Sequence, residues 1–98
     1  MHKTTILNNG LSLLTQSMPH TKSVSIAFFI GAGSRYESND IAGASHFLEH
    51  LLFKGTKRWP TARELSEAIE GVGGVMNAST DREMTTYWCK VPKAHFRI

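Results

Sequence analysis

The fold is decided by one stretch near the middle of the chain, IAGASHFLEHLLFK, residues 41–54. Its apolar residues recur at i, i+3, i+4, i+7 and i+8, the spacing typical of one face of an α-helix. These residues are Ala44, Phe47, Leu48, Leu51 and Leu52. We therefore predict a helix over residues 41–54 whose apolar stripe packs against the rest of the domain, and Gly55 is expected to end it.

The opposite face of this helix carries two histidines and a glutamate. His46 and His50 are four residues apart and Glu49 follows His46 by three, so all three side chains project from one side. Neutral imidazoles are good zinc ligands, and zinc lowers the pKa of a bound water to roughly 7. The pattern predicts a zinc site with His46 and His50 as ligands and Glu49 as general base. The alternative is a chance pattern of three structural side chains.

Strands are predicted before this helix. Residues 4–8 and 11–16 flank Asn9-Gly10, the dipeptide that favours a type I′ hairpin turn, so the chain is expected to open as a hairpin. Residues 23–30 alternate between two faces, which predicts a central strand, half or fully buried. The apolar face of this strand carries Val24, Ile26, Phe28 and Ile30.

A second helix and two more strands are predicted after the motif. Residues 61–64 have the spacing of a capping box, and glycines after residue 70 end the helix. Its inward stripe is Leu65, Ala68, Ile69 and Val72. Strands are expected at 75–80 and 84–91, and residues 92–98 resemble the first turn of another helix. The predicted fold class is α+β, a two-layer sandwich of sheet and helices.

Composition places the chain among ordinary globular domains. Of its 98 residues 41% are hydrophobic, and 11 basic residues against 8 acidic ones are too few to indicate nucleic acid. The one basic cluster, Lys54, Lys57 and Arg58, is interpreted as a solvated loop. The N-terminus has no long apolar core, so neither a signal peptide nor a membrane span is expected. Cys89 is the single cysteine, expected to be a buried thiol in a reducing compartment.

Several motifs occur in the order found in the pitrilysin and mitochondrial processing peptidase family. They are GSRYE at 33–37, ASHFLEH at 44–50 with FKGT at 53–56, GGVMNAST at 73–80 and EMTTY at 83–87. The chain resembles this family over nearly its whole length, from the opening hairpin to Trp88. The resemblance implies a zinc peptidase of the inverted H-x-x-E-H type. It also implies a processing-peptidase-like metallohydrolase fold, of which residues 1–98 would be an incomplete N-terminal portion.

The resemblance also assigns site residues. His46 and His50 would bind Zn²⁺ and Glu49 would activate water. The family's third ligand is a glutamate on a later helix, expected beyond residue 98, so these 98 residues alone are expected to be inactive. Asn77 and Ala78 would lie on an edge strand that accepts a substrate peptide as an added strand. That Asn77 only shapes the sheet edge is the alternative.

Partners and compartment follow from the same resemblance. The expected partners are a peptide or unfolded polypeptide substrate and either a second similar half or another copy of the chain, with no nucleic acid and no membrane. A bacterial cytoplasm is expected, with the mitochondrial matrix as the alternative. Two rival functions stay open. One is a non-catalytic scaffold or partner subunit of the same family, and the other is an S-ribosylhomocysteine lyase, for which Cys89 comes too early to be the third ligand.

Overall fold

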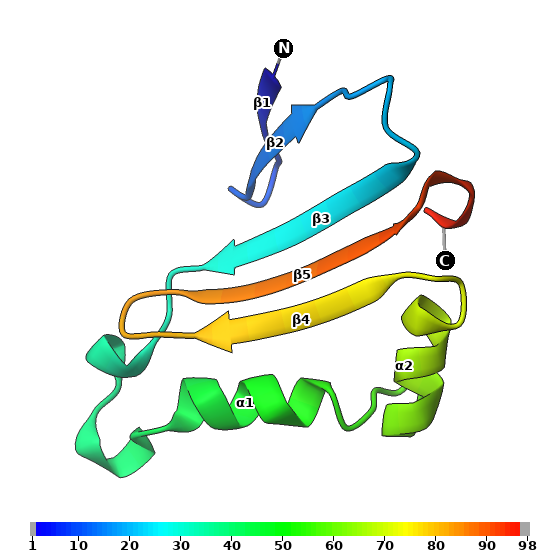
Figure 1. Cartoon of the computed structure of the whole chain (residues 1–98). Helices are drawn as coiled ribbons and strands as arrows, with labels where there is room; N and C mark the ends of the chain where they lie inside the picture. Colours follow the sequence, from blue (N-terminus) through cyan, green and yellow to red (C-terminus); the bar gives the residue numbers. More distant parts are fainter. Residues whose placement is uncertain (1, 97–98) are drawn as a thin grey trace.

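Two antiparallel sheets and two helices make up the computed structural model, which describes residues 2–96 (Figure 1). The first sheet is the hairpin of β1 (His2–Ile6) and β2 (Ser12–Gln16). The second has three strands in the order β3 (Ser23–Ile30), β5 (Thr85–Pro92) and β4 (Val75–Thr80). The helices α1 (Ala44–Leu52) and α2 (Ala62–Glu70) lie between β3 and β4 in the sequence. The predicted α+β class is confirmed.

The opening hairpin turns by a different geometry from the one predicted. A type I′ turn needs positive φ at both central residues, yet among the described residues positive φ occurs at glycines alone, including Gly10 at 88°. The N–H of Gly10 donates to the carbonyl of Leu7 at 2.9 Å, and the N–H of Leu7 donates to the carbonyl of Leu11 at 2.8 Å. The connection is therefore a longer hairpin loop that ends in one left-handed glycine, and the prediction of type I′ is wrong.

The prediction that residues 23–30 form a central strand is also wrong. β3 lies at an edge of the three-stranded sheet, and β5 is the strand with partners on both sides (Figure 1). Phe28 on β3 is 56% exposed, so the strand is not half or fully buried. Alternation in the sequence reports which side chains share a face, but it does not report how many neighbouring strands there are. The position of β3 at the edge follows from the pairing of β5, which lies between β3 and β4.

The register defines one face of the sheet that the helices partly cover. Ile26 pairs with Cys89, Phe28 pairs with Tyr87, and Tyr87 pairs with Ala78 on its other side. Leu65 and Ile69 of α2 line an apolar groove of about 250 Å³ together with residues of this face. The most buried residues of β5 are Val91 and Thr85, each 4% exposed. Cys89 is half-buried, not fully buried as expected, and is a free thiol.

The first helix is shorter than predicted and the second begins as predicted. Gly43 has φ of 88°, a left-handed conformation that separates α1 from a short 3₁₀ turn at Asn39–Ile41, so the helix starts at Ala44 and not at residue 41. α2 has the predicted capping box, in which the side chains of Thr61 and Glu64 each accept from the other's backbone N–H. After Pro92, a single 3₁₀ turn at Lys93–His95 follows. The last two residues of the predicted 92–98 turn lie outside the described residues.

The apolar stripe of α1 does not pack as the periodicity predicts. Phe47 is 66% exposed and Leu48 is 54% exposed, with Leu51 and Leu52 exposed as well. The helix meets the sheet with the other side, where Glu49 and Phe53 are half-buried. The sequence identifies two faces of the helix, but within residues 2–96 the apolar stripe stays largely exposed, and only Leu52 at its end reaches the groove lined by the sheet and α2. Neither helix in this part of the chain has the length and apolar character needed to cross a bilayer.

The segment after β3 is fixed to the turn that joins β4 and β5. The N–H of Ser34 donates to the carbonyl of Asp81 at 3.3 Å, and the N–H of Arg35 donates to the carbonyl of Arg82 at 2.8 Å. Gly33 is buried at this crossing, and a Cβ on it would overlap the backbone carbonyls of Asp81 and Arg82. A glycine is therefore needed here because the backbones approach closely. Its φ of 180° is extended and would be open to any residue.

We predict that Gly33→Ala destabilises the fold by about 1–3 kcal/mol, because backbone must move to make room for the methyl group. Gly31→Ala is the matched control, since a Cβ on Gly31 meets no atom within 4 Å. Thermal unfolding followed by circular dichroism should give a lower midpoint for Gly33→Ala and a nearly unchanged one for Gly31→Ala. Equal midpoints for the two variants would contradict the close approach.

Candidate metal and catalytic site

The two histidines of α1 point at one place. The Nε2 atoms of His46 and His50 are 2.8 Å apart, and their ring centroids are 4.6 Å apart with the planes inclined at 60°. One helical turn separates the residues, so the backbone alone brings the rings together. Both side chains are exposed. The predicted pair of ligands is therefore brought together with its nitrogens converging.

This arrangement fits two ligands of a zinc ion. Nitrogens bound to one tetrahedral zinc at about 2.1 Å each lie about 3.4 Å apart, so a small opening of the pair accommodates the ion. Within residues 2–96 no group of three or more His, Cys, Asp or Glu side chains could hold a metal. The described part of the chain therefore offers two protein ligands, one fewer than a catalytic zinc site has.

Glu49 lies beside this pair and is held by the sheet. Its Oε2 accepts a hydrogen bond from the hydroxyl of Thr80 at the end of β4. Burial, and secondly the negative charge of Glu49, raise the pKa of the Tyr87 hydroxyl, so Tyr87 of β5 also lies near this carboxylate. Glu49, His50 and Asn77 line one cavity of about 350 Å³. The cavity thus joins the motif on α1 to the strand β4.

The predicted substrate strand lies where an added strand could pair. Within the described sheet β4 has β5 on one side and no strand on the other. The backbone N–H of Ala78 donates to the side-chain Oδ1 of Asn77 at 2.8 Å. Asn77 therefore satisfies a donor of its own strand, which agrees with a role in shaping the edge. Ala78 shares the helix-facing side of the sheet with Tyr87, and Asn77 shares the opposite side with Trp88.

Sequence reasoning missed the residue that fixes the start of α1. The carboxylate of Glu37 accepts the N–H of Gly43 at 2.8 Å and that of Ser45 at 2.7 Å. The hydroxyl and N–H of Ser45, followed by the N–H of Gly43, hold the pKa of Glu37 below its ordinary value. An acceptor ahead of the helix satisfies amides that have no partner inside it. The signal in the sequence that could have identified it is an acidic residue shortly before the predicted helix.

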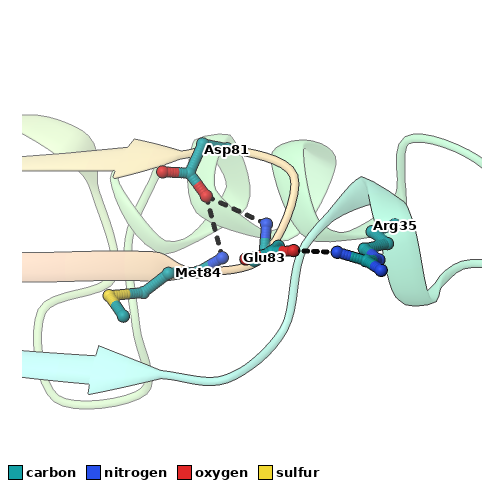
Figure 2. Close-up of polar contacts among 4 residues, drawn as sticks. All are labelled: Arg35, Asp81, Glu83 and Met84. Atoms are coloured by element: carbon teal, nitrogen blue, oxygen red, sulfur yellow. Dashed lines mark hydrogen bonds and ion pairs between the residues drawn. The ribbon is translucent and has the colours of Figure 1, made fainter.

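Sequence reasoning also missed the polar residues at and around the β4–β5 turn, which are Thr80, Arg35, Asp81 and Glu83. Figure 2 shows Asp81 accepting from the backbone N–H groups of Glu83 and Met84, at 3.0 and 2.8 Å, and Arg35 paired with the Glu83 carboxylate. The two N–H groups lower the pKa of Asp81. These contacts close the turn directly after Thr80. The Asp81 contacts are local and are those of a turn closed by an aspartate side chain, whereas the pair of Arg35 and Glu83 joins residues 48 positions apart and has no local pattern.

The sequence matches a known family over most of its length. Residues 12–98 match the model of the insulinase family, peptidase family M16. The chain belongs to peptidase family M16. It is 49% identical over 89 residues to the probable mitochondrial-processing peptidase subunit beta of Arabidopsis thaliana, covering 91% of this chain and 17% of that one. It is also 45% identical over 87 residues to an uncharacterized zinc protease of Bacillus subtilis, covering 89% and 21%.

A solved structure agrees with this membership in the M16 family. The chain is similar to a protease from Helicobacter pylori with a TM-score of 0.85 and 34% identity, over 96% of this chain and 22% of the other. The chain therefore spans about a fifth of the length of these relatives.

We predict that Glu37→Gln lowers the thermal midpoint by a few degrees at neutral pH, because an amide group replaces one of the two acceptor oxygens. The pKa of Glu37 is lowered in the folded state, so its stabilisation is present above the ordinary value of 4.5 and is lost as the pH falls through the folded value. The variant should therefore lose less stability than the parent on acidification. Melting curves across this pH range measure both effects.

The control for this experiment is Glu67→Gln, which removes one carboxylate from an exposed pair with Arg63 on α2. Such surface pairs contribute little, so its midpoint should stay close to that of the parent. If Glu37→Gln behaved like Glu67→Gln at every pH, the capping role of Glu37 would be rejected.

Proposed function

We propose that this chain is the N-terminal portion of a zinc-dependent endopeptidase in which His46 and His50 bind the metal and Glu49 is the general base. The observation that carries the proposal is the convergence of two Nε2 atoms 2.8 Å apart on the helix that also places Glu49 in the cavity along β4. Imidazole pairs of this kind are typical zinc ligands. The names of the relatives, a zinc protease and a processing peptidase, agree with this function.

The role of each side chain follows from its chemistry. His46 and His50 donate nitrogen lone pairs in their neutral forms, and each must keep its proton on Nδ1 to do so. Bound zinc would acidify a water molecule and polarise the carbonyl of the scissile bond. Glu49 accepts the proton of the attacking water and returns it to the leaving amine, so the hydroxyl adds to carbon and the peptide C–N bond breaks.

The substrate we propose is an extended peptide or unfolded polypeptide lying along β4. An added strand would offer a carbonyl to the N–H of Ala78, in place of the Asn77 side chain that now accepts it. The freed amide of Asn77 could then bond to the peptide. A peptide added along β4 would extend beyond α1 on both sides. Peptide bonds in the interior of the substrate chain would therefore reach the site, which favours endopeptidase action.

A complete site needs more chain than residues 2–96 supply. We propose that a third ligand comes from the portion that the longer relatives possess, and that a second similar half completes the enclosure for the substrate, as the name "subunit beta" of one relative suggests for that protein. The lone thiol Cys89 agrees with a reducing compartment, a bacterial cytoplasm or alternatively a mitochondrial matrix. The lyase and scaffold alternatives are not favoured by the similarity to zinc proteases.

In the full-length protein, we expect Glu49→Gln to keep its zinc and lower the rate of peptide hydrolysis by about 10²- to 10⁴-fold, because an amide cannot take up the proton. His46→Ala and His50→Ala should lose both zinc and activity, since each removes a ligand. Zinc is measured by elemental analysis and turnover with a quenched fluorescent peptide. His95→Ala, in the 3₁₀ turn after β5, is the control and should resemble the parent. Hydrolysis by Glu49→Gln at the rate of the parent, or full zinc in His46→Ala, would refute the proposal.

For residues 1–98 alone, we predict weak zinc binding, no peptide hydrolysis, and self-association. Two imidazoles leave a tetrahedral ion half satisfied, and a third ligand would have to come from another copy. The exposed stripe of α1, with Phe47 66% exposed, gives the copies an apolar surface to share. Zinc titration combined with light scattering tests both parts. A monomer that binds zinc with nanomolar affinity would show that a third ligand lies within these residues.

A further inference from the structure

Thr80 makes a contact that the proposed reaction does not by itself require. It is the last residue of β4, and its hydroxyl donates to Oε2 of Glu49, a residue 31 positions earlier on α1. Within residues 2–96 this is the one side-chain hydrogen bond between α1 and the three-stranded sheet. Both residues are half-buried, so water competes less for this bond than it would at the surface.

We infer that Thr80 is a positioning residue, which fixes the carboxylate of Glu49 in the orientation that proton transfer needs. A carboxylate has two oxygens, and rotation about the last side-chain bond exchanges them. With Oε2 accepting from Thr80, that rotation stops and Oε1 is the oxygen left to receive a proton. Restricting the base to one orientation lowers the entropic part of the barrier. This inference rests on the proposed function of Glu49.

The position of Thr80 is itself held firmly. Its cross-strand partner is Thr85, which is 4% exposed and whose hydroxyl donates to the carbonyl of Ala32 at 2.8 Å. Directly after it, the N–H of Asp81 donates to the carbonyl of Met84 at 3.0 Å, and the Asp81 carboxylate accepts two backbone N–H groups (Figure 2). The hydroxyl is thus presented from one of the most constrained parts of the sheet, which suits a group that must fix another.

The helix that carries Glu49 is fixed from its other end. Glu37 binds the N–H groups of Gly43 and Ser45, so the start of α1 cannot slide along its axis without breaking two charge-assisted hydrogen bonds. Between this anchor and Thr80, the backbone of Glu49 has little freedom. The remaining freedom lies in the carboxylate itself, and the Thr80 hydroxyl is the group that removes it.

The experiment compares Thr80→Val with Thr80→Ser in the full-length protein. Valine keeps the shape and removes the hydroxyl, so we expect kcat to fall by about ten- to a hundredfold, part of what a general base contributes, while KM and zinc content stay within about twofold. Serine keeps the hydroxyl and should restore kcat to within about threefold of the parent. Thr86→Val is the matched control, because Thr86 is half-buried on the opposite face of β5 and should leave kcat unchanged.

Each alternative outcome is distinct. If Thr80→Val keeps the parent kcat, or if serine does no better than valine, the inference is overturned. If the zinc content or the thermal midpoint of Thr80→Val falls in step with kcat, Thr80 supports the fold and does not orient Glu49, which also overturns the inference. Should the valine variant fail to fold, Thr80→Ala is compared with Thr80→Ser by the same criteria. A parent protein that does not hydrolyse peptides would instead refute the proposed function, which the Glu49→Gln comparison tests separately.

Discussion

The contact of α1 with β4 through the polar side of the helix is the constraint on which the arrangement depends. A helix with a clear apolar stripe normally buries that stripe, and each buried leucine or phenylalanine contributes roughly 1.5–3 kcal/mol. Here Glu49 faces the sheet and Phe47 is 66% exposed. Most of that hydrophobic free energy is therefore not gained within residues 2–96, although Leu52 at the end of the stripe lines the apolar groove. The orientation instead keeps the histidines and the glutamate next to the strand edge.

Polar anchors supplement the limited apolar contact of α1, which is made by Leu52 and Phe53 at its C-terminal end. Glu37 holds the N-terminal end of α1 through two backbone N–H groups, and Thr80 holds Glu49 near its middle. The β4–β5 turn is in turn fastened to the segment after β3 by backbone hydrogen bonds across Gly33 and by the pair of Arg35 and Glu83 (Figure 2). Exposed ion pairs contribute little alone, so the backbone bonds and the close approach at Gly33 carry most of this connection.

Local patterns predicted the elements whose cause is local. The bounds of β4 agree with the predicted 75–80, and the start of α2 agrees with a capping box formed by adjacent residues. Two of the wrong predictions concern features without a local cause: the edge position of β3, which depends on where β5 pairs, and the exposed stripe of α1, which depends on a covering element. The left-handed Gly43 and the longer turn at Gly10 are local, but glycine permits several backbone conformations and its identity does not select one.

The candidate site divides in the same way, and the division has a consequence for metal binding. His46 and His50 are brought together by one turn of helix, so spacing alone revealed them. The contact of Thr80 with Glu49 joins residues 31 positions apart and has no periodic signal, whereas Glu37 binds residues only six and eight positions after it. In the proposed enzyme the third ligand also comes from a distant part of the chain. Two histidines on one helical turn bind zinc weakly by themselves. Tight binding therefore requires the tertiary fold that supplies the third ligand. Metal affinity and the orientation of Glu49 are then both set by long-range packing, which couples an active site to a completely folded protein.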